Sequence, residues 1–510
     1  MNTMTDTEKK LDSGNNAADQ VYLEKGAMEQ FQEPYQFTPE EEKKLVWKID
    51  LMILPIMLIA YMMAFLDKQT LSYTALMGLQ EDLGLEGADY SWSSSIFYFG
   101  YLFFSWPASL LMVKFPLGKY LACNLCVSHN SVATPANTII SIIWAVVLAC
   151  HAATKNFAGI MVTRFFLGVT EASLSPGFSL LTSLWYRTSE QPLRHGIWFC
   201  GNSISLIIGN VIAVGIWQIK GGLHPWQWVF IIFGLITFVW GLVMLFRLPD
   251  SPSSASFLNE KEKLIAMERL KSNKAGFKSN KIDRDQIFEA LRDVKTWLLA
   301  VLILGSNIPN GGFTTFNGLI LKGFGYSTFH TLLLGMPGGA VVFVFILLSS
   351  IVSSKVPNSR CIVIVVVTCI SILGSALVYA TTSIASRYAG LLLMGLYSVG
   401  MPLSMAMISS NVGGFTKRAT VSAIYFIMYC AGNIIGPQLF FEKQAPKYQS
   451  GFQAILVCLV IVVIDVIALA FYLRWENSRR DKKYPRDPET IQGQLADTTD
   501  LQNKEFRYVY

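Results

Sequence analysis

The chain has 510 residues, of which 52% are hydrophobic and only 15% are charged. A soluble protein carries about a quarter charged residues, so this composition excludes an ordinary soluble protein and indicates many membrane spans. The net charge of +6 is distributed over the segments between apolar stretches, which argues against a nucleic-acid-binding surface.

Residues 1–45 are polar, with acidic and basic side chains mixed, and they show no signal-peptide pattern. Because they are poor in apolar residues, we predict a disordered cytoplasmic tail. Twelve apolar stretches follow, each close to the ~20 residues that cross a bilayer as a helix. They lie at residues 49–71, 91–113, 136–153, 157–180, 196–219, 226–247, 296–321, 329–352, 360–380, 388–410, 419–441 and 452–474. The sequence therefore predicts an all-α polytopic membrane protein with twelve transmembrane helices.

A polar segment at residues 248–295 divides these spans into two sets of six, at 46–247 and 296–474. Within it, the stretch FLNEKEKLIAMERLKSN places a few apolar residues among charges, which is typical of an amphipathic helix at a membrane surface. Residues 475–510 are polar again and are predicted to form a second cytoplasmic tail.

The two sets of spans share short features that indicate a duplicated six-helix unit. The second span of each half has a proline followed by small residues, at Pro107 and Pro337. The fifth span of each half holds an asparagine, Asn202 in FCGN and Asn433 in YCAGN. Repeated halves with a substrate site between them are a common plan of secondary transporters. We therefore expect two pseudo-symmetric six-helix bundles.

The distribution of basic residues predicts the orientation. Of the 41 lysines and arginines, 32 lie in segments on one side of the twelve spans, six lie on the other side and three lie in or at spans. By the positive-inside rule, both termini and the central segment are cytoplasmic. Plasma and vacuolar membranes would present the same charge bias.

Four ionisable residues interrupt the apolar stretches of the first half. Arg164 and Glu171 are seven residues apart, so they share one helix face and lie roughly 10 Å apart along its axis. Asp67 and Lys68 form a second pair in the first span. Charges inside a membrane are costly and generally mark a transport pathway, so we favour that role over structural ion clamps between helices.

The polar block SHNSVATPANT fits poorly between two apolar halves of the third span. Removing residues 128–143 would join those halves into one clean span. Val127 and Ser128 can be encoded by GTAAGT, a common intron start, so a retained intron is one hypothesis and a genuine loop the other. The sequence of the transcript decides between them.

Four motifs together carry a family resemblance. They are FLDKQTLSY (65–73), PLGKYL (116–121), RFFLGVTEASLSPG (164–177) and AGNIIG (431–436). With the twelve-span plan, they make the chain resemble the major facilitator superfamily, and within it the fungal allantoate permease-like group of the anion:cation symporters. The resemblance implies proton-coupled import of a small organic anion, such as allantoate, nicotinate, another vitamin-like carboxylate or a short acidic peptide. It also favours the plasma membrane.

The resemblance also implies roles for individual residues. Asp67 and Glu171 match the proton carriers, and Lys68 takes the place of the cation that contacts the substrate carboxylate. Several relatives have arginine there, and a lysine offers a point charge in place of a two-pronged fork. Tyr101 and Asn433 match polar substrate-facing positions. On physical grounds, a low-dielectric environment raises the proton affinity of Glu171. Arg164, on the same helix face, lowers it.

Three more asparagines are candidates for substrate binding. In the seventh span, NIPNGGFTTFNG contains Pro309 followed by two glycines, which predicts a broken helix with Asn307 and Asn310 beside the break. These amides either bind substrate or satisfy the freed backbone, and the sequence favours neither. Asn202 is a similar candidate in the fifth span.

Two other functions remain as alternatives. One is an efflux antiporter of the same fold, and the other is a transport-inactive nutrient receptor. The fifth span, GNSISLIIGNVIAVG, lacks the kink motif of drug antiporters, and the tails are short for a signalling receptor. No nucleophilic set, phosphate loop or metal-ligand cluster is present, so we expect neither an enzyme nor a cofactor. The expected partners are the organic anion, protons and the lipid bilayer, with the chain acting as a monomer and without nucleic acid.

Overall fold

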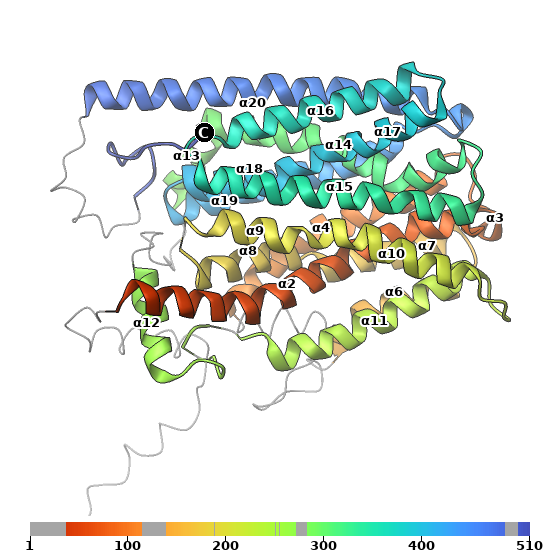
Figure 1. Cartoon of the computed structure of the whole chain (residues 1–510), viewed down its shortest axis with the longest axis horizontal. Helices are drawn as coiled ribbons and strands as arrows, with labels where there is room; N and C mark the ends of the chain where they lie inside the picture. The colour runs from red at the N-terminus through yellow and green to blue at the C-terminus, as the bar shows by residue number, and fades with distance from the viewer. Residues whose placement is uncertain are drawn as a thin grey trace, which may run out of the picture.

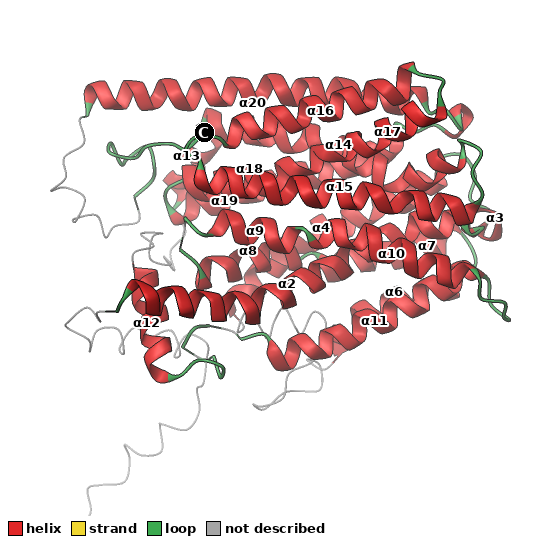
Figure 2. Cartoon of the chain, in the orientation of Figure 1, coloured by secondary structure: helices red, strands yellow, loops and turns green. Residues whose placement is uncertain are grey.

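The computed structural model describes residues 37–114, 139–187, 189–249, 251–253, 255–271, 283–484 and 498–510. In these residues the structure is helical with no strand, and long helices run side by side in one bundle (Figures 1 and 2). Residues 128–138 of the polar block lie outside the described residues, and the described part of the third span starts at Ile139.

The first half contributes six spans, two of which consist of consecutive helices. They are α2 (Pro39–Leu76), α4 (Asp89–Lys114), α6 (Ile139–Cys150), α7 (Phe157–Glu171) with α8 (Leu174–Trp185), α9 (Gln191–Phe199) with α10 (Gly201–Trp217), and α11 (Pro225–Arg247). The short helices α3 (Leu79–Leu83) and η3 (His151–Ala153) lie between spans.

The second half contributes six more spans. They are α14 (Val294–Lys322), α15 (Thr328–Lys355), α16 (Arg360–Ala380), α17 (Ile384–Met394) with η4 (Gly395–Val399) and α18 (Gly400–Asn411), α19 (Phe415–Gln438), and α20 (Gln449–Lys483). The remaining helices are α12 (Glu260–Lys271) and α13 (Arg284–Arg292) between the halves, and η5 (Glu442–Gln444). The twelve-helix fold predicted from the sequence is confirmed, and in the part of the chain that the structure describes, nine helical segments are long and apolar enough to cross a membrane.

Both ends of the described chain lie at the same end of the bundle, together with α12 and α13 (Figure 1). We call this the termini end, and the other the opposite end. The first helix starts at Pro39, where Thr38 and Glu41 form a capping box. Residues 39–45 are therefore helical, and the predicted disordered tail does not extend to residue 45.

The predicted break in the seventh span is wrong, because α14 continues through Pro309. Its glycines instead permit a close approach to α19: a Cβ atom on Gly311 would lie 2.7 Å from the backbone oxygen of Asn433. A Cβ on Gly436 of α19 would collide with the backbone of Ile308. Tertiary packing therefore keeps the helix continuous where local sequence favours a break.

The equivalent pair in the first half shows the same close approach. A Cβ atom on Gly201 of α10 would lie 2.5 Å from the backbone oxygen of Leu58 in α2. The first and fifth spans of each half, α2 with α10 and α14 with α19, are therefore in contact near their backbones. This correspondence agrees with the pseudo-symmetry expected from the sequence.

Residues 498–510 fold back onto the termini end of the second half. The carboxylate of Asp500 is fully buried and accepts hydrogen bonds from Lys295 of α14 at 2.7 Å and Lys417 of α19 at 2.8 Å. Burial acts to raise the pKa of Asp500, but the two lysines outweigh it and hold the pKa below its ordinary value. We call Asp500 with its two lysines the tail cluster.

Candidate substrate and proton-coupling site

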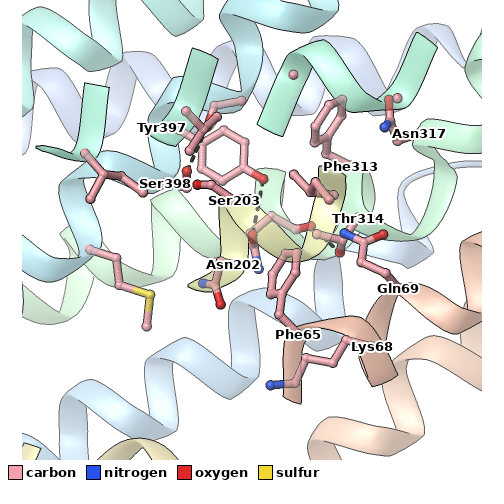
Figure 3. A pocket seen from close by; sticks show the side chains of 18 of the residues that line it. Phe65, Lys68, Gln69, Asn202, Ser203, Phe313, Thr314, Asn317, Tyr397 and Ser398 are labelled. Atoms are coloured by element: carbon pink, nitrogen blue, oxygen red, sulfur yellow. Dashed lines mark hydrogen bonds between the residues drawn. The ribbon is translucent and has the colours of Figure 1, made fainter. Parts of the chain in front are cut away.

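A cavity lies between the two halves and contains about 1170 Å³ of space not filled by atoms. The first half lines it with α2 and α10, and the second half with α14, α15, α19 and the η4 region. Figure 3 shows side chains from these helices converging on it. The polar residues that line it are Lys68, Gln69, Asn202, Ser203, Ser306, Asn307, Asn310, Thr314, Asn317 and Ser398, with Tyr61, Tyr388, Tyr397 and Tyr429.

Lys68 is the only charged residue among the described residues that line this cavity. Its ammonium nitrogen lies 3.1 Å from a carboxylate oxygen of Glu171, whose side chain is only 1% exposed. The same ammonium lies over the rings of Phe97 and Tyr101, at 5.3 and 5.8 Å from their centroids. Aromatic faces stabilise a desolvated cation, so Lys68 is held at the cavity wall with a single carboxylate as counter-charge.

Asp67 precedes Lys68 on α2, so its side chain lies about 100° further around the helix and away from Lys68. It is fully buried, and neither carboxyl oxygen has a hydrogen-bond partner among the described residues. Arg164 of α7 lies nearby, donating to the backbone carbonyl of Asp67 at 3.4 Å and to the hydroxyl of Thr70 at 3.2 Å. Most buried polar groups in proteins are hydrogen-bonded, so the Asp67 carboxyl is an exception.

The charge pairs therefore differ from those read along the sequence. Arg164 and Glu171 share a buried face of α7, as predicted, but the ion pair of Glu171 is with Lys68. Arg164 instead contacts α2 beside Asp67. Both cross-helix contacts depend on how α2 is rotated against α7, which sequence spacing within one helix does not determine.

Three of the predicted asparagines form one hydrogen-bonded chain on the second half. Asn310 donates to Asn433 at 2.8 Å, and Asn433 donates to Asn307 at 3.0 Å. Tyr397 donates to Asn310 at 3.2 Å. Asn307 also donates to the backbone carbonyl of Ile303 at 2.8 Å. Its amide therefore bonds the helix backbone, which was one of the two roles that the sequence left open. We call these four linked side chains the amide wall.

Two other predicted residues have different surroundings. Asn202 lines the cavity, and its side-chain oxygen has no hydrogen-bond partner among the described residues. Tyr101 is buried outside the cavity lining, where its ring stacks on Phe426 at 5.3 Å and lies under Lys68. The geometry therefore places Tyr101 behind Lys68 as a support for the cation.

Several lining residues escaped the sequence analysis. Gln69 directly follows the Asp-Lys pair, and Asn317 ends the asparagine-rich motif of α14. Both residues could have been predicted from the sequence, because each belongs to a motif that already contained candidate site residues. Tyr397 lies in the 3₁₀ segment η4, and no sequence signal distinguished it from the other tyrosines.

Near the opposite end, a belt of hydrogen bonds joins the two halves. Tyr90 donates to the carbonyl of Thr315 at 2.9 Å, and Ser91 donates to the carbonyl of Pro437 at 3.0 Å. Ser95 accepts from Gln438 at 3.0 Å. These bonds close the cavity toward the opposite end in this conformation, so exchange with that side requires the halves to move apart.

Comparisons with known proteins concern the family and the fold of the chain. The sequence profile described as Major Facilitator Superfamily matches residues 57–437. An uncharacterized transporter of Schizosaccharomyces pombe is 38% identical over 92% of this chain and 90% of its own length. The allantoate permease of Saccharomyces cerevisiae is 37% identical, covering 92% of this chain and 87% of that protein. A thiamine pathway transporter of the same yeast is 32% identical, with coverages of 92% and 87%.

One solved structure is similar in fold. It is a bacterial homologue of the human lysosomal transporter Spinster, in an inward-facing and occupied conformation. It has a TM-score of 0.56 and 15% sequence identity, and the match covers 85% of this chain and 98% of that one. At this identity the likeness concerns the fold alone.

Proposed function

The chain belongs to the Major Facilitator Superfamily, and we propose that it is a proton-coupled symporter that imports a small organic anion. Its relatives are transporters and permeases, so it is a transporter and not an enzyme. The observation that carries the proposal is the ion pair between Lys68 and Glu171, in which the sole charged residue of the described cavity lining has a buried carboxylate as its partner.

The proposed coupling follows from competition for Lys68. When a substrate carboxylate enters the cavity and pairs with the ammonium, Glu171 loses its counter-charge while it remains buried. A buried carboxylate without a counter-charge is strongly disfavoured, so Glu171 takes up a proton. Substrate and proton then bind together, and each favours the binding of the other.

Asp67 and Arg164 are proposed as a second coupling unit. Asp67 is buried near the indole of Trp144 without a well-formed hydrogen bond, and Arg164 is anchored beside it on α7. A change in the charge of Asp67 alters its attraction to Arg164, and thereby the contact between α2 and α7. This provides a route from proton binding to helix movement, as alternating access requires.

The composition of the cavity favours a particular kind of substrate. One ammonium group pairs with one carboxylate, and the amide wall offers donors and acceptors on the other side. Phe65, Phe199 and Phe313 add apolar surface. Allantoate and nicotinate fit this description, and the similarity to an allantoate permease supports starting with allantoate.

We further propose that the termini end is cytoplasmic and that the protein resides in the plasma membrane. The excess of lysine and arginine on that side supports the orientation. The belt at the opposite end then closes the cavity to the outside.

Uptake of labelled allantoate and nicotinate into proteoliposomes, with and without an inward proton gradient, tests the function. We expect accumulation above the external concentration only with the gradient. The Lys68→Met variant should lose about 2 kcal/mol or more of substrate affinity, or roughly thirtyfold, because it removes the only cation of the described cavity lining. Accumulation that survives a protonophore would contradict symport, and gradient-driven export would favour the antiporter alternative.

A further inference from the structure

An open groove runs along the membrane-facing surface between α2 and α11, near the termini end. It contains about 990 Å³ of open space and is separate from the central cavity. It is lined by Leu51, Met52, Pro55, Ile56, Val239, Leu242, Val243, Phe246 and Arg247. Each helix contributes residues from one face at intervals of three to four, so the groove follows the helices for about two turns.

The lining of the groove is apolar except at one end. Arg247 is the last residue of α11 and is exposed. Among the described residues it forms no ion pair, unlike two other basic side chains at the termini end of this half, Lys48 and Arg194. Lys48 contacts Glu262 at 2.7 Å, and Arg194 contacts Asp50 at 2.8 Å. Arg247 is therefore a cation free to bind an anion at the mouth of an apolar groove.

The position of the groove matches the boundary between acyl chains and headgroups. Trp47 lies one turn before Leu51 on α2 and is 65% exposed. Exposed tryptophans on membrane helices lie at the level of the headgroups, and an arginine at a span end extends its guanidinium to the same level. The apolar part of the groove then lies at the depth of acyl chains.

We propose that this groove is a binding site for one anionic phospholipid. An acyl chain lies between α2 and α11, and the headgroup phosphate pairs with Arg247. We expect the lipid to be anionic because no carboxylate of the described residues pairs with the cation at its mouth, and a zwitterionic headgroup carries no net charge. This inference depends on membrane insertion alone, so it holds or fails independently of the proposed symport.

Native mass spectrometry of the purified full chain, titrated with phosphatidylserine or phosphatidylcholine of identical acyl chains, tests the site. We expect one phosphatidylserine to bind more tightly than the rest, and phosphatidylcholine to lack this first site. Arg247→Gln should weaken that first binding by roughly fivefold, as expected for the loss of one basic contact. Val239→Trp, which fills the groove without changing charge, should also remove it.

The matched control is Lys355→Gln, which removes an exposed cation from the termini end of another span. It should leave the first phosphatidylserine in place. Equal binding of both lipids, or unchanged binding in Arg247→Gln, would overturn the proposal. A dimer that Val239→Trp dissociates would also overturn it, because a second copy would then occupy the groove.

Discussion

Two clusters of buried charge among the described residues differ in how fully their polar atoms are satisfied. In the tail cluster, Asp500 accepts hydrogen bonds from two lysines, from the hydroxyl of Tyr508 at 2.8 Å and from the backbone of Gly413 at 3.1 Å. The membrane cluster consists of Asp67, Lys68, Arg164 and Glu171. In it, Glu171 contacts only the ammonium of Lys68, at 3.1 Å, and the buried carboxyl of Asp67 lies near the indole of Trp144 without a well-formed hydrogen bond.

The difference separates a structural role from a transport role. A fully bonded buried network specifies one arrangement, and losing any member leaves others uncompensated. A buried carboxyl group with few hydrogen bonds exchanges a proton or a counter-charge at a lower free-energy cost than a fully bonded one does. We therefore expect the membrane cluster to control coupling and the tail cluster to control stability.

The largest effect should come from Glu171→Gln, which makes the partner of Lys68 permanently neutral. Proton-driven accumulation should disappear, so that the ratio of internal to external substrate falls to about one, because the linkage between proton and substrate is lost. Exchange of labelled for unlabelled substrate should persist. Both are measured in proteoliposomes, with the exchange assay as the control for folding. Uphill uptake by this variant would assign coupling to another residue.

The reverse pattern is expected for Asp500→Ala. It removes one of the two carboxylates that the buried Lys295 and Lys417 share, while the other, Asp293, remains, so the free energy of unfolding should fall by about 2–3 kcal/mol. Thermal unfolding of the purified protein measures the loss. The matched control is Asp481→Ala, since Asp481 forms an ion pair with Arg507 but is 59% exposed, and such pairs contribute about 1 kcal/mol or less. A stable Asp500→Ala protein with impaired coupling would reverse our assignment of the two clusters.

A smaller effect is expected at the amide wall, which belongs to neither cluster. Asn433→Leu removes the central link and leaves Asn307 and Asn310 without their shared partner, at a cost of about 1–3 kcal/mol. We expect KM to rise roughly tenfold with coupling intact. Tyr397→Phe removes only the terminal bond and should have a weaker effect in the same uptake assay. An unchanged KM in both variants would exclude the wall from substrate binding.

The smallest effect concerns pH. Because the folded-state pKa of Asp500 is lowered, its contribution to attaching residues 498–510 is fully present above its unfolded value of about 4. It is lost as pH falls through the folded value, when the carboxylate is protonated. Hydrogen exchange of residues 498–510 should therefore accelerate only below about pH 4. The Asp500→Asn variant should lack this transition, and a transition near neutral pH would implicate another group.

The fold was predictable because hydropathy and span length act locally. Asp67, Lys68 and Glu171 were identifiable since charges stand out in apolar stretches, but their partners were not. The pairing of Lys68 with Glu171 depends on packing between helices about a hundred residues apart in the chain. Asp500 was read as part of a polar tail because its lysine partners lie 83 and 205 residues away. The break expected at Pro309 was wrong because packing against α19 outweighed a local signal.

The glycine contacts between α14 and α19 set the size of the moving parts. Within each half, where these glycines bring two backbones together, sliding or rolling of one helix on the other would produce a collision. The pairs α14 with α19 and α2 with α10 should therefore each move as one rigid unit. Spin labels on α14 and α19 should keep a constant separation through the transport cycle, while labels on α2 and α14 change theirs. The transporter therefore has fewer independently moving units than it has helices.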